Sequence, residues 1–439
     1  MRARPSRTRA ALVLALALAT SACSWIGREF PPPPGHGHTF RATGFFHTAF
    51  DGDRWWLVTP DGRPFYSTGV NHVSASPDTD RKTGICPYCE AVATKYPNVD
   101  AWRNGAVDRL RSWGFNTIGA WSDTDRFAAR MPYTVLLDMA GGGDWFSPDF
   151  EARAASIAAS AVVSRRDDPN LVGWLLDNEL HWGPDWRMQH PLLDDYLTLP
   201  PGSPGRAVAD HYVGNPNGFL RALAARYFRV TTVAIRAQDP HHLILGVRMI
   251  AQLAPREVIE AARPYVDVFS VNHYTLLPGL DEAIQRAWGP YVPVDPTLSA
   301  FHEISDLPIM VTEYSFRAAD SGVPNSWPPI FPTLATQQDR ANAYAASVQR
   351  LYSAPWIVGD HWFEYADEPP GGRFDGEDSN FGLVSNRDVP WQTLVDRMTR
   401  VHAMAPDRLA DRRLPCGSWE RTGPDDHVRC VERAPRPEH

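Results

Sequence analysis

The sequence lacks the motifs that identify several common enzyme classes. It contains no His-Glu-x-x-His segment, no Gly-x-Ser-x-Gly elbow and no glycine-rich loop that ends in Lys-Ser or Lys-Thr. These absences argue against a zinc-protease helix, a serine-hydrolase elbow and a phosphate-binding loop. The net charge of −8 also disfavours nucleic acid and anionic membrane surfaces as partners. We therefore expect no cofactor and no metal site.

Long hydrophobic runs are scarce as well. Four arginines precede the apolar run Ala10–Ala19, which is too short to span a membrane stably. Small residues then lead to Cys23, as in a bacterial lipoprotein signal, although Thr20 stands where leucine is usual. We expect residues 1–22 to be a signal peptide and the protein to be exported. It is then either a cell-envelope lipoprotein anchored through Cys23 or a secreted protein.

Cysteine is rare, with five residues in 439. Because export permits disulfides, the preferred interpretation is two bridges, Cys86–Cys89 and Cys416–Cys430. A zinc site built from these four cysteines stays open as the alternative. The second bridge would staple a small C-terminal appendage over residues 406–439. At the other end, residues 23–39 contain four consecutive prolines and are expected to form a semi-rigid tether.

The segment 40–405 alternates short apolar runs with longer helical patterns. It begins with a predicted β-hairpin, Arg54–Thr59 and Pro64–Ser67, around a Pro-Asp-Gly turn. Eight strands with intervening helices predict an α/β fold, a (β/α)8 TIM barrel. The strands are expected at 65–71, 117–121, 134–138, 171–178, 243–247, 266–272, 309–313 and 356–362. The helices are expected near 100–113, 149–166, 216–238, 255–262, 338–353 and 390–404.

Two of the apolar runs end in a carboxylate. The fourth run, Leu171–Asn178, is followed by Glu179, and the seventh ends at Glu313. In a (β/α)8 barrel the active site lies at the carboxyl ends of the strands, so these two side chains should converge. Cleavage of a glycosidic bond with retention needs such a pair. Glu179 is predicted to be the general acid/base and Glu313 the nucleophile.

Longer motifs around these residues resemble a known group of enzymes. Asn178-Glu179, Glu313 and Trp362, each at a strand end, look like the pattern of clan A retaining glycoside hydrolases. A closer likeness is to the β-agarases of glycoside hydrolase family 50. It is carried by Trp55-Trp-Leu-Val-Thr-Pro-Asp-Gly62, Gly69-Val-Asn71, Gly173-Trp-Leu-Leu-Asp-Asn-Glu-Leu180, Thr312-Glu-Tyr-Ser-Phe316 and Asn380-Phe-Gly-Leu-Val384. The resemblance implies a retaining β-glycosidase acting on a galactose-containing polysaccharide.

Further polar and aromatic residues at the strand ends are candidates for binding the sugar. Trp362 is expected to be the platform beneath the reacting ring, and Tyr274 to donate a hydrogen bond to Glu313. Arg248 could orient either glutamate, and Glu364 could bind substrate or pair with an arginine. For each histidine or tryptophan the alternative is a structural role. The complete set of predicted substrate-binding residues is Asn71, His72, Trp121, Asn178, Trp182, Arg248, Asn272, His273, Tyr274, Trp362 and Glu364.

The sequence thus predicts an exported retaining β-glycoside hydrolase whose partner is a neutral carbohydrate, agarose or another β-galactoside-containing glycan by resemblance. The long loops at 183–215 and 275–305 are expected to form its substrate subsites. Two alternatives stay open. One is a non-catalytic, surface glycan-binding lipoprotein, and the other is a transglycosylase that uses the same glutamate pair.

Overall fold

The computed structural model describes residues 39–127, 130–410, 418–421 and 428–431. Within that part of the chain, no helix combines the length and the apolar character that a membrane crossing requires. The predicted signal peptide, Cys23 and Cys416 lie outside the described residues. The predicted C-terminal disulfide is therefore not among the features described, although β15 (Ser418–Arg421) and β16 (Val428–Val431) pair there as an antiparallel ribbon.

The predicted hairpin is confirmed and gains a third strand. β2 (Trp55–Val58) pairs with β3 (Pro64–Phe65), and β1 (His47–Phe50) pairs with the other edge of β2. The turn needs a glycine at position 62, where φ is +90° and an added Cβ would lie 2.5 Å from the Phe40 carbonyl oxygen.

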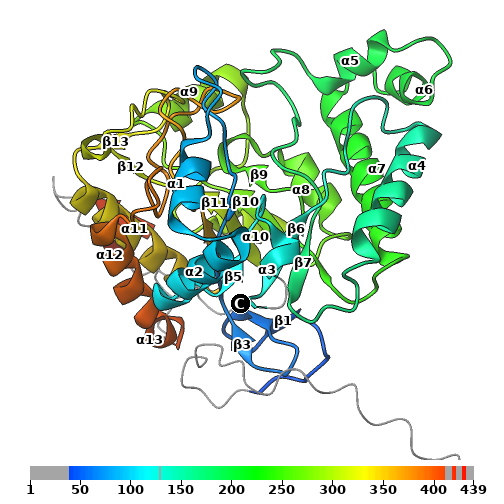
Figure 1. The fold of residues 1–439 in the computed structure, drawn as a ribbon. Helices are drawn as coiled ribbons and strands as arrows, with labels where there is room; N and C mark the ends of the chain where they lie inside the picture. Colours follow the sequence, from blue (N-terminus) through cyan, green and yellow to red (C-terminus); the bar gives the residue numbers. More distant parts are fainter. Residues whose placement is uncertain (1–38, 128–129, 411–417, 422–427, 432–439) are drawn as a thin grey trace, which may run out of the picture. The chain divides into compact units, whose positions relative to one another are not determined.

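A nine-stranded parallel sheet forms the centre of the protein, and helices lie on both sides of it in Figure 1. Its strand order is β8-β7-β6-β5-β4-β14-β11-β10-β9. The strands are β4 (Ser67–Val70), β5 (Thr117–Ile118), β6 (Tyr133–Leu136), β7 (Leu171–Leu175), β8 (Leu243–Ile244), β9 (Met249–Ile250), β10 (Phe269–Asn272), β11 (Ile309–Tyr314) and β14 (Ile357–Trp362). Each of the eight predicted strands therefore has its counterpart.

The two edge strands, β8 and β9, belong to one segment of chain. Gly246 (φ +84°) interrupts the predicted fifth strand, 243–247, and Arg248 (φ +48°) lies between this segment and β9. The interrupted segment still bonds to both neighbours: the Leu245 amide donates to the Trp174 carbonyl at 2.8 Å, and the Ser270 amide donates to the Leu245 carbonyl at 3.0 Å. The sheet thus curls until its edges meet through one segment, which is consistent with a TIM-like barrel.

The predicted helices are confirmed, and local capping explains where several of them begin. Asn98, Ser147 and Asn215 cap the first turns of α2, α4 and α7, and Thr336 opens α11 with a capping box. The helices are α2 (Val99–Ser112), α4 (Pro148–Ile157), which continues as a π-helical turn (Ala158–Val162), α7 (Pro216–Arg236), α8 (Arg256–Ala262), α11 (Gln337–Ser353) and α12 (Gln392–Ala403).

Other elements were not anticipated. The two predicted long loops contain short helices, α5 (Leu192–Thr198) and α6 (Pro204–Asp210) in the first, and α9 (Leu280–Trp288) and α10 (Ser299–Ser305) in the second. The remaining elements are α1 (Pro87–Lys95), α3 (Thr124–Phe127), α13 (Ala405–Ala410), and the parallel pair β12 (Arg317–Ala318) and β13 (Thr333–Leu334).

The three-stranded sheet closes the amino-terminal end of the parallel strands. Leu57 and Phe65 of this small sheet, with Phe46 directly before β1, are buried in one cluster with residues of the parallel strands such as Val172 and Met310. In Figure 1 the small sheet lies below the parallel strands. Burying a side chain such as Leu57 contributes roughly 1.5–3 kcal/mol to stability. The opposite, carboxyl-terminal end of the strands is therefore the one left for a site.

One predicted disulfide is confirmed. Cys86 and Cys89 are joined across the first turn of α1, and the Cys86 sulfur also accepts a hydrogen bond from the Cys89 amide. Because these two sulfurs bond to each other, the four-cysteine zinc site considered from the sequence is wrong.

Candidate active site

Glu179 and Glu313 meet at the carboxyl ends of the strands, as the sequence predicts. Glu179 follows β7, and Glu313 is the fifth residue of β11. The link between them is Asn272, the last residue of β10, which is the strand next to β11. Its side-chain amide nitrogen lies 2.9 Å from Glu179 Oε1 and 3.3 Å from Glu313 Oε2.

This shared donor limits how far apart the two carboxylates can be. Glu179 Oε1 and Glu313 Oε2 cannot be separated by more than the two bond lengths together, about 6.2 Å. Retaining glycosidases hold their carboxyl groups roughly 5–5.5 Å apart, and inverting enzymes hold them roughly 6.5–9.5 Å apart. The same amide nitrogen also lies 3.1 Å from Asn178 Oδ1, so the residue before Glu179 joins the cluster.

Glu313 is buried and surrounded by donors. Tyr274 donates its hydroxyl hydrogen to Oε1 at 2.8 Å, and Arg248 Nη2 donates to Oε2 at 2.7 Å. Hydrogen bonds of this kind favour the ionised form of a carboxyl group. The predicted contact from Tyr274 is confirmed, and Arg248 orients Glu313 rather than Glu179.

Glu179 has a different electrostatic environment. Burial and the negative charge of Glu313 raise the pKa of Glu179 to about 7, while the hydrogen bond from Asn272 opposes the rise. Burial disfavours a charged carboxylate, and a second carboxylate nearby disfavours it further. Glu179 is therefore substantially protonated near neutral pH, whereas Glu313 accepts hydrogen bonds from Tyr274 and Arg248. This asymmetry suits an acid and a nucleophile.

The main chain at Glu179 is held from two sides. Its φ is +50°, an unusual value for a residue with a side chain. The Glu179 amide lies 3.3 Å from the Arg248 carbonyl, and Arg187 Nη1 donates to the Glu179 carbonyl at 2.8 Å. Arg187 is itself held by Asp185, whose Oδ2 lies 2.7 Å from Arg187 Nη2. This clamp was not predicted from the sequence, because Asp185 and Arg187 lie in a loop and not at a strand end.

Arg248 connects Glu313 to the predicted aromatic residue Trp121. The Arg248 side chain is fully buried, and its guanidinium carbon lies 4.0 Å from the centre of the Trp121 ring. Trp121 itself is 39% exposed. Among the predicted tryptophans, Trp121 therefore combines nearness to Glu313 with a face that a sugar ring could reach.

Three predicted substrate-binding residues have structural positions instead. Trp362 is 0% exposed and donates its indole N–H to the Phe381 carbonyl, so the prediction that it is the sugar platform is wrong. Trp182 is only 4% exposed and packs against Trp145 and Phe228, at the edge of the cavity between the two long loops. Asn71 is also buried. Its side-chain amide donates to the Thr312 carbonyl and accepts from the Ala120 amide, which joins the ends of three strands.

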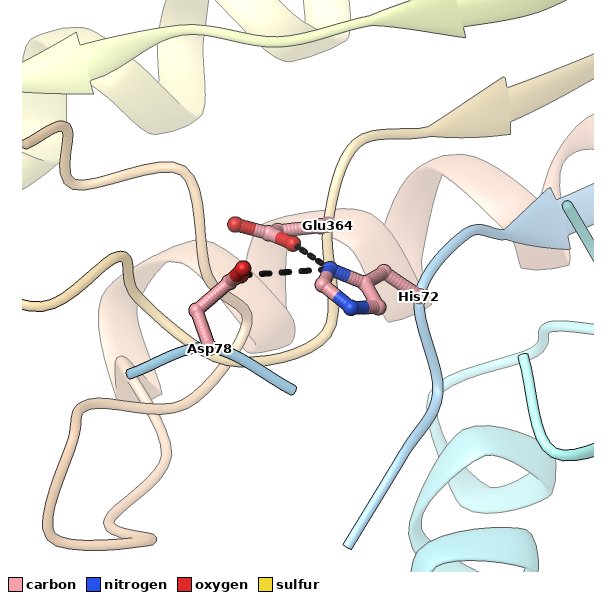
Figure 2. A group of neighbouring side chains, drawn as sticks. All are labelled: His72, Asp78 and Glu364. Carbon is pink, nitrogen blue, oxygen red and sulfur yellow. Dashed lines mark hydrogen bonds and ion pairs between the residues drawn. The ribbon is translucent and has the colours of Figure 1, made fainter. Parts of the chain in front are cut away.

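The predicted histidines and Glu364 lie at the same end of the strands. The His273 amide donates to the Glu313 carbonyl at 2.8 Å, and burial lowers the pKa of its imidazole to about 4, so that the ring is neutral at physiological pH. His72 Nδ1 lies 2.5 Å from Glu364 Oε2, the pairing drawn in Figure 2. Glu364 thus pairs with a histidine and not with the arginine considered from the sequence.

The two predicted subsite loops pack against each other. Tyr291 donates its hydroxyl to the Pro184 carbonyl, and Trp288 Nε1 donates to Gln189 Oε1 at 3.0 Å. A cavity of about 730 Å³ lies between them, lined by residues of both loops together with the start of α7. Their role as substrate subsites stays a prediction.

Comparison with known proteins confirms the likeness predicted from the sequence. No family model matches the chain. The chain is 26% identical to β-agarase A of Vibrio sp. (strain JT0107), over 80% of this chain and 45% of that protein. It is 23% identical to β-agarase B of the same strain, over 82% and 48%. A solved agarase, AgWH50C, superposes with a TM-score of 0.72 at 26% identity, covering 85% of this chain and 65% of that one. The chain therefore spans about half the length of the curated relatives it matches.

Proposed function

We propose that this protein is a retaining glycoside hydrolase that cleaves β-glycosidic bonds of agarose or a related neutral galactan, on a closed (β/α)8 barrel. The observation that carries the proposal is the single Asn272 amide nitrogen within hydrogen-bonding distance of both Glu179 and Glu313. It limits the distance between Glu179 Oε1 and Glu313 Oε2 to about 6.2 Å, which supports double displacement over a mechanism that holds a water between more widely spaced carboxyl groups.

In the first step, Glu313 attacks the anomeric carbon while Glu179 gives its proton to the leaving glycosidic oxygen. The result is a covalent glycosyl–enzyme ester and a free leaving sugar. In the second step, Glu179 takes a proton from water, which attacks the anomeric carbon and releases Glu313. Tyr274 and Arg248 hold Glu313 in place for attack through their contacts with its two oxygens.

The substrate class is inferred from the relatives. The two curated relatives are β-agarases, and AgWH50C is described as an agarase. Trp121, with its partly exposed ring beside Arg248, is the aromatic surface proposed for the reacting sugar. His72, His273 and Asn178 are proposed to contact sugar hydroxyl groups.

Glu179→Gln and Glu313→Gln test the chemistry, because each keeps the shape of the side chain and removes the acid or the nucleophile. With agarose, each variant should lose three or more orders of magnitude in kcat while its melting temperature stays close to that of the wild type. Glu90→Gln, at an exposed position on α1 outside the loop cavity, is the matched control and should retain activity.

Two further measurements separate the proposal from its alternatives. Azide should rescue Glu313→Ala and yield a glycosyl azide of inverted configuration, whereas proton NMR of the wild-type reaction should show retained configuration in the first product. Agarose binding without hydrolysis by the wild type would favour a glycan-binding protein. Longer oligosaccharide products would favour transglycosylation, which shares the covalent intermediate. Full activity of either Gln variant would contradict the assignment.

We also propose that the chain is exported, with residues 1–22 removed and Cys23 lipidated. Metabolic labelling with a fatty-acid analogue tests this in a bacterial host. Cys23→Ser should abolish the label and release the protein from the membrane fraction. A wild-type protein that carries no label and is absent from the membrane fraction would instead indicate ordinary secretion.

A further inference from the structure

Three side chains that could bind a metal ion converge where β4 and β14 end. His72 follows β4 by two residues, Glu364 follows β14 by two residues, and Asp78 lies in the loop after His72. β4 and β14 are neighbouring parallel strands, so their carboxyl ends lie side by side. Figure 2 shows the three side chains pointing toward one another from separate stretches of chain.

The distances within this cluster are short. His72 Nδ1 lies 2.5 Å from Glu364 Oε2 and 3.6 Å from Asp78 Oδ2, and one potential ligand atom from each residue lies within 4.8 Å of the others. With metal–ligand bonds of about 2.1 Å, two ligands of one ion can be separated by up to about 4.2 Å. Small side-chain rotations would therefore let all three atoms contact one ion.

A second observation points to a ligand at this position. Glu364 is only 1% exposed, and its Oε1 atom has no hydrogen-bond partner among the described residues. A buried carboxylate oxygen without a partner is costly, and buried charges are normally paired or bound to metal ions. Figure 2 draws the other oxygen of this carboxylate, Oε2, on the dashed line to His72, so Oε1 is the remaining acceptor of a side chain that already belongs to the cluster.

The balance of charge around this cluster favours a bound cation. Arg373 is the neighbouring arginine, and its guanidinium is engaged by other carboxylates: Nη2 lies 2.6 Å from Glu377 and 3.0 Å from Asp375, and Nε lies 3.6 Å from Glu368. Asp78 and Glu364 add two more carboxylates. Among the ion pairs of the described residues, His72 is the positive group that pairs with both of them. Carboxylates thus outnumber cations here.

We propose that His72, Asp78 and Glu364 bind one divalent cation of the first transition series, with Mn²⁺ as the representative ion. An imidazole nitrogen together with two carboxylate oxygens suits Mn²⁺ or Zn²⁺ better than Ca²⁺ or Mg²⁺, which prefer oxygen ligands alone. The ion would replace the hydrogen between His72 and Glu364, and water would complete its coordination. It would tie the loop after β4 to the loop after β14, beside the glutamate pair. The expectation from sequence that there is no metal site would then be wrong.

Mn²⁺ binding to the whole protein tests the proposal without any use of agarose hydrolysis. The protein is treated with EDTA, exchanged into metal-free buffer and titrated with MnCl₂ in a calorimeter, while free Mn²⁺ is followed by electron paramagnetic resonance. Mn²⁺ is preferred over Zn²⁺ as the probe because the chain has 15 histidines, several of which would bind Zn²⁺ nonspecifically.

The wild type should bind one Mn²⁺ per chain. Asp78→Asn and Glu364→Gln should each weaken binding at least ten-fold. Asp108→Asn, on α2 with a side chain 72% exposed, removes one carboxylate elsewhere and should bind as the wild type does. Asp78→Asn is the more informative variant because Asp78 is partly exposed, so the substitution should leave the fold intact, which a thermal melt will verify. No saturable binding to the wild type, or equal binding by Asp78→Asn, would overturn the proposal and indicate a protonated His72 held between two carboxylates.

Discussion

Replacing Asn272 by alanine removes the donor shared by Glu179 and Glu313. The hydrogen bond from Asn272 lowers the pKa of Glu179, against the upward effects of burial and of Glu313. Without it, Glu179 should hold its proton to higher pH. The two carboxylates should also separate, because the group that holds both of them is gone.

The size of the effect follows from the strength of the hydrogen bond that Asn272 donates to Glu179. A hydrogen bond to a charged group contributes about 1.5–3 kcal/mol, and about 1.4 kcal/mol corresponds to one pH unit. Because the Asn272 amide group is shared among three acceptors, we expect its hydrogen bond to Glu179 to contribute about 1.5 kcal/mol, the lower end of this range. The alkaline limb of the kcat/KM profile should move upward by about one pH unit, and kcat should fall roughly ten- to hundred-fold.

The direction of the alkaline limb follows from the role of Glu179. An acid catalyst is active when protonated, so wild-type activity should decline as the pH rises through the Glu179 pKa, about 7. The assay is kcat/KM on a soluble agaro-oligosaccharide between pH 4 and 10, with calorimetry to verify folding.

Asn116→Ala is the matched control for this experiment. The Asn116 side chain also makes partly buried hydrogen bonds, accepting from the Thr68 amide and donating to the Tyr66 carbonyl, but at the amino-terminal side of β5. It should lower the melting temperature without moving the pH profile. A profile for Asn272→Ala that superimposes on that of the wild type, with kcat unchanged, would refute the bridging role.

Three further substitutions test other parts of the site. Tyr274→Phe removes the 2.8 Å hydrogen bond to Glu313 and should lower kcat roughly ten- to hundred-fold with little loss of stability, as measured by steady-state kinetics and a thermal melt. Arg187→Ala removes the hydrogen bond to the Glu179 carbonyl and a positive charge that lowers the Glu179 pKa. Its kcat should fall about ten-fold, and the alkaline limb of its kcat/KM profile should move to higher pH. Arg187→Lys keeps the charge, so it should return the alkaline limb toward the wild-type pH more fully than it restores kcat. Trp362→Ala should destabilise the fold by about 3–5 kcal/mol in urea denaturation, because Trp362 is a core residue; unchanged stability with a raised KM would instead support the platform role.

Much of the fold was predictable because the relevant signals are local. Apolar runs of the right length marked the eight strands, and longer helical patterns between them marked six of the helices. The break in the fifth strand was not predictable, because the run from Leu243 to Val247 is apolar throughout while Gly246 within it adopts a positive φ value. The short helices in the two long loops were missed because each spans only seven to nine residues, although Leu280, Ile284 and Trp288 of α9 do recur at helical spacing.

The candidate site divides in the same way. The positions of Glu179 and Glu313 follow from where each strand ends, since the carboxyl ends of parallel strands meet on one side of a sheet. The direction of each side chain does not follow. Asn71 and His72 are adjacent, yet one is buried between strand ends and the other faces Glu364. Trp362 was misjudged because aromatic residues at a strand end can equally pack into the core.

The order of residues along the chain was enough to identify those that stand at the ends of the strands, and with them the pair of glutamates and the likeness to β-agarases. Which of these residues touch one another depends on the folded protein. The fold places Asn272 between Glu179 and Glu313, Arg187 behind Glu179, and Asp78 beside His72 and Glu364. The difference is one of range. Strand and helix formation depends on neighbours in sequence, whereas these contacts join segments up to nearly 300 residues apart and depend on how the whole sheet curls.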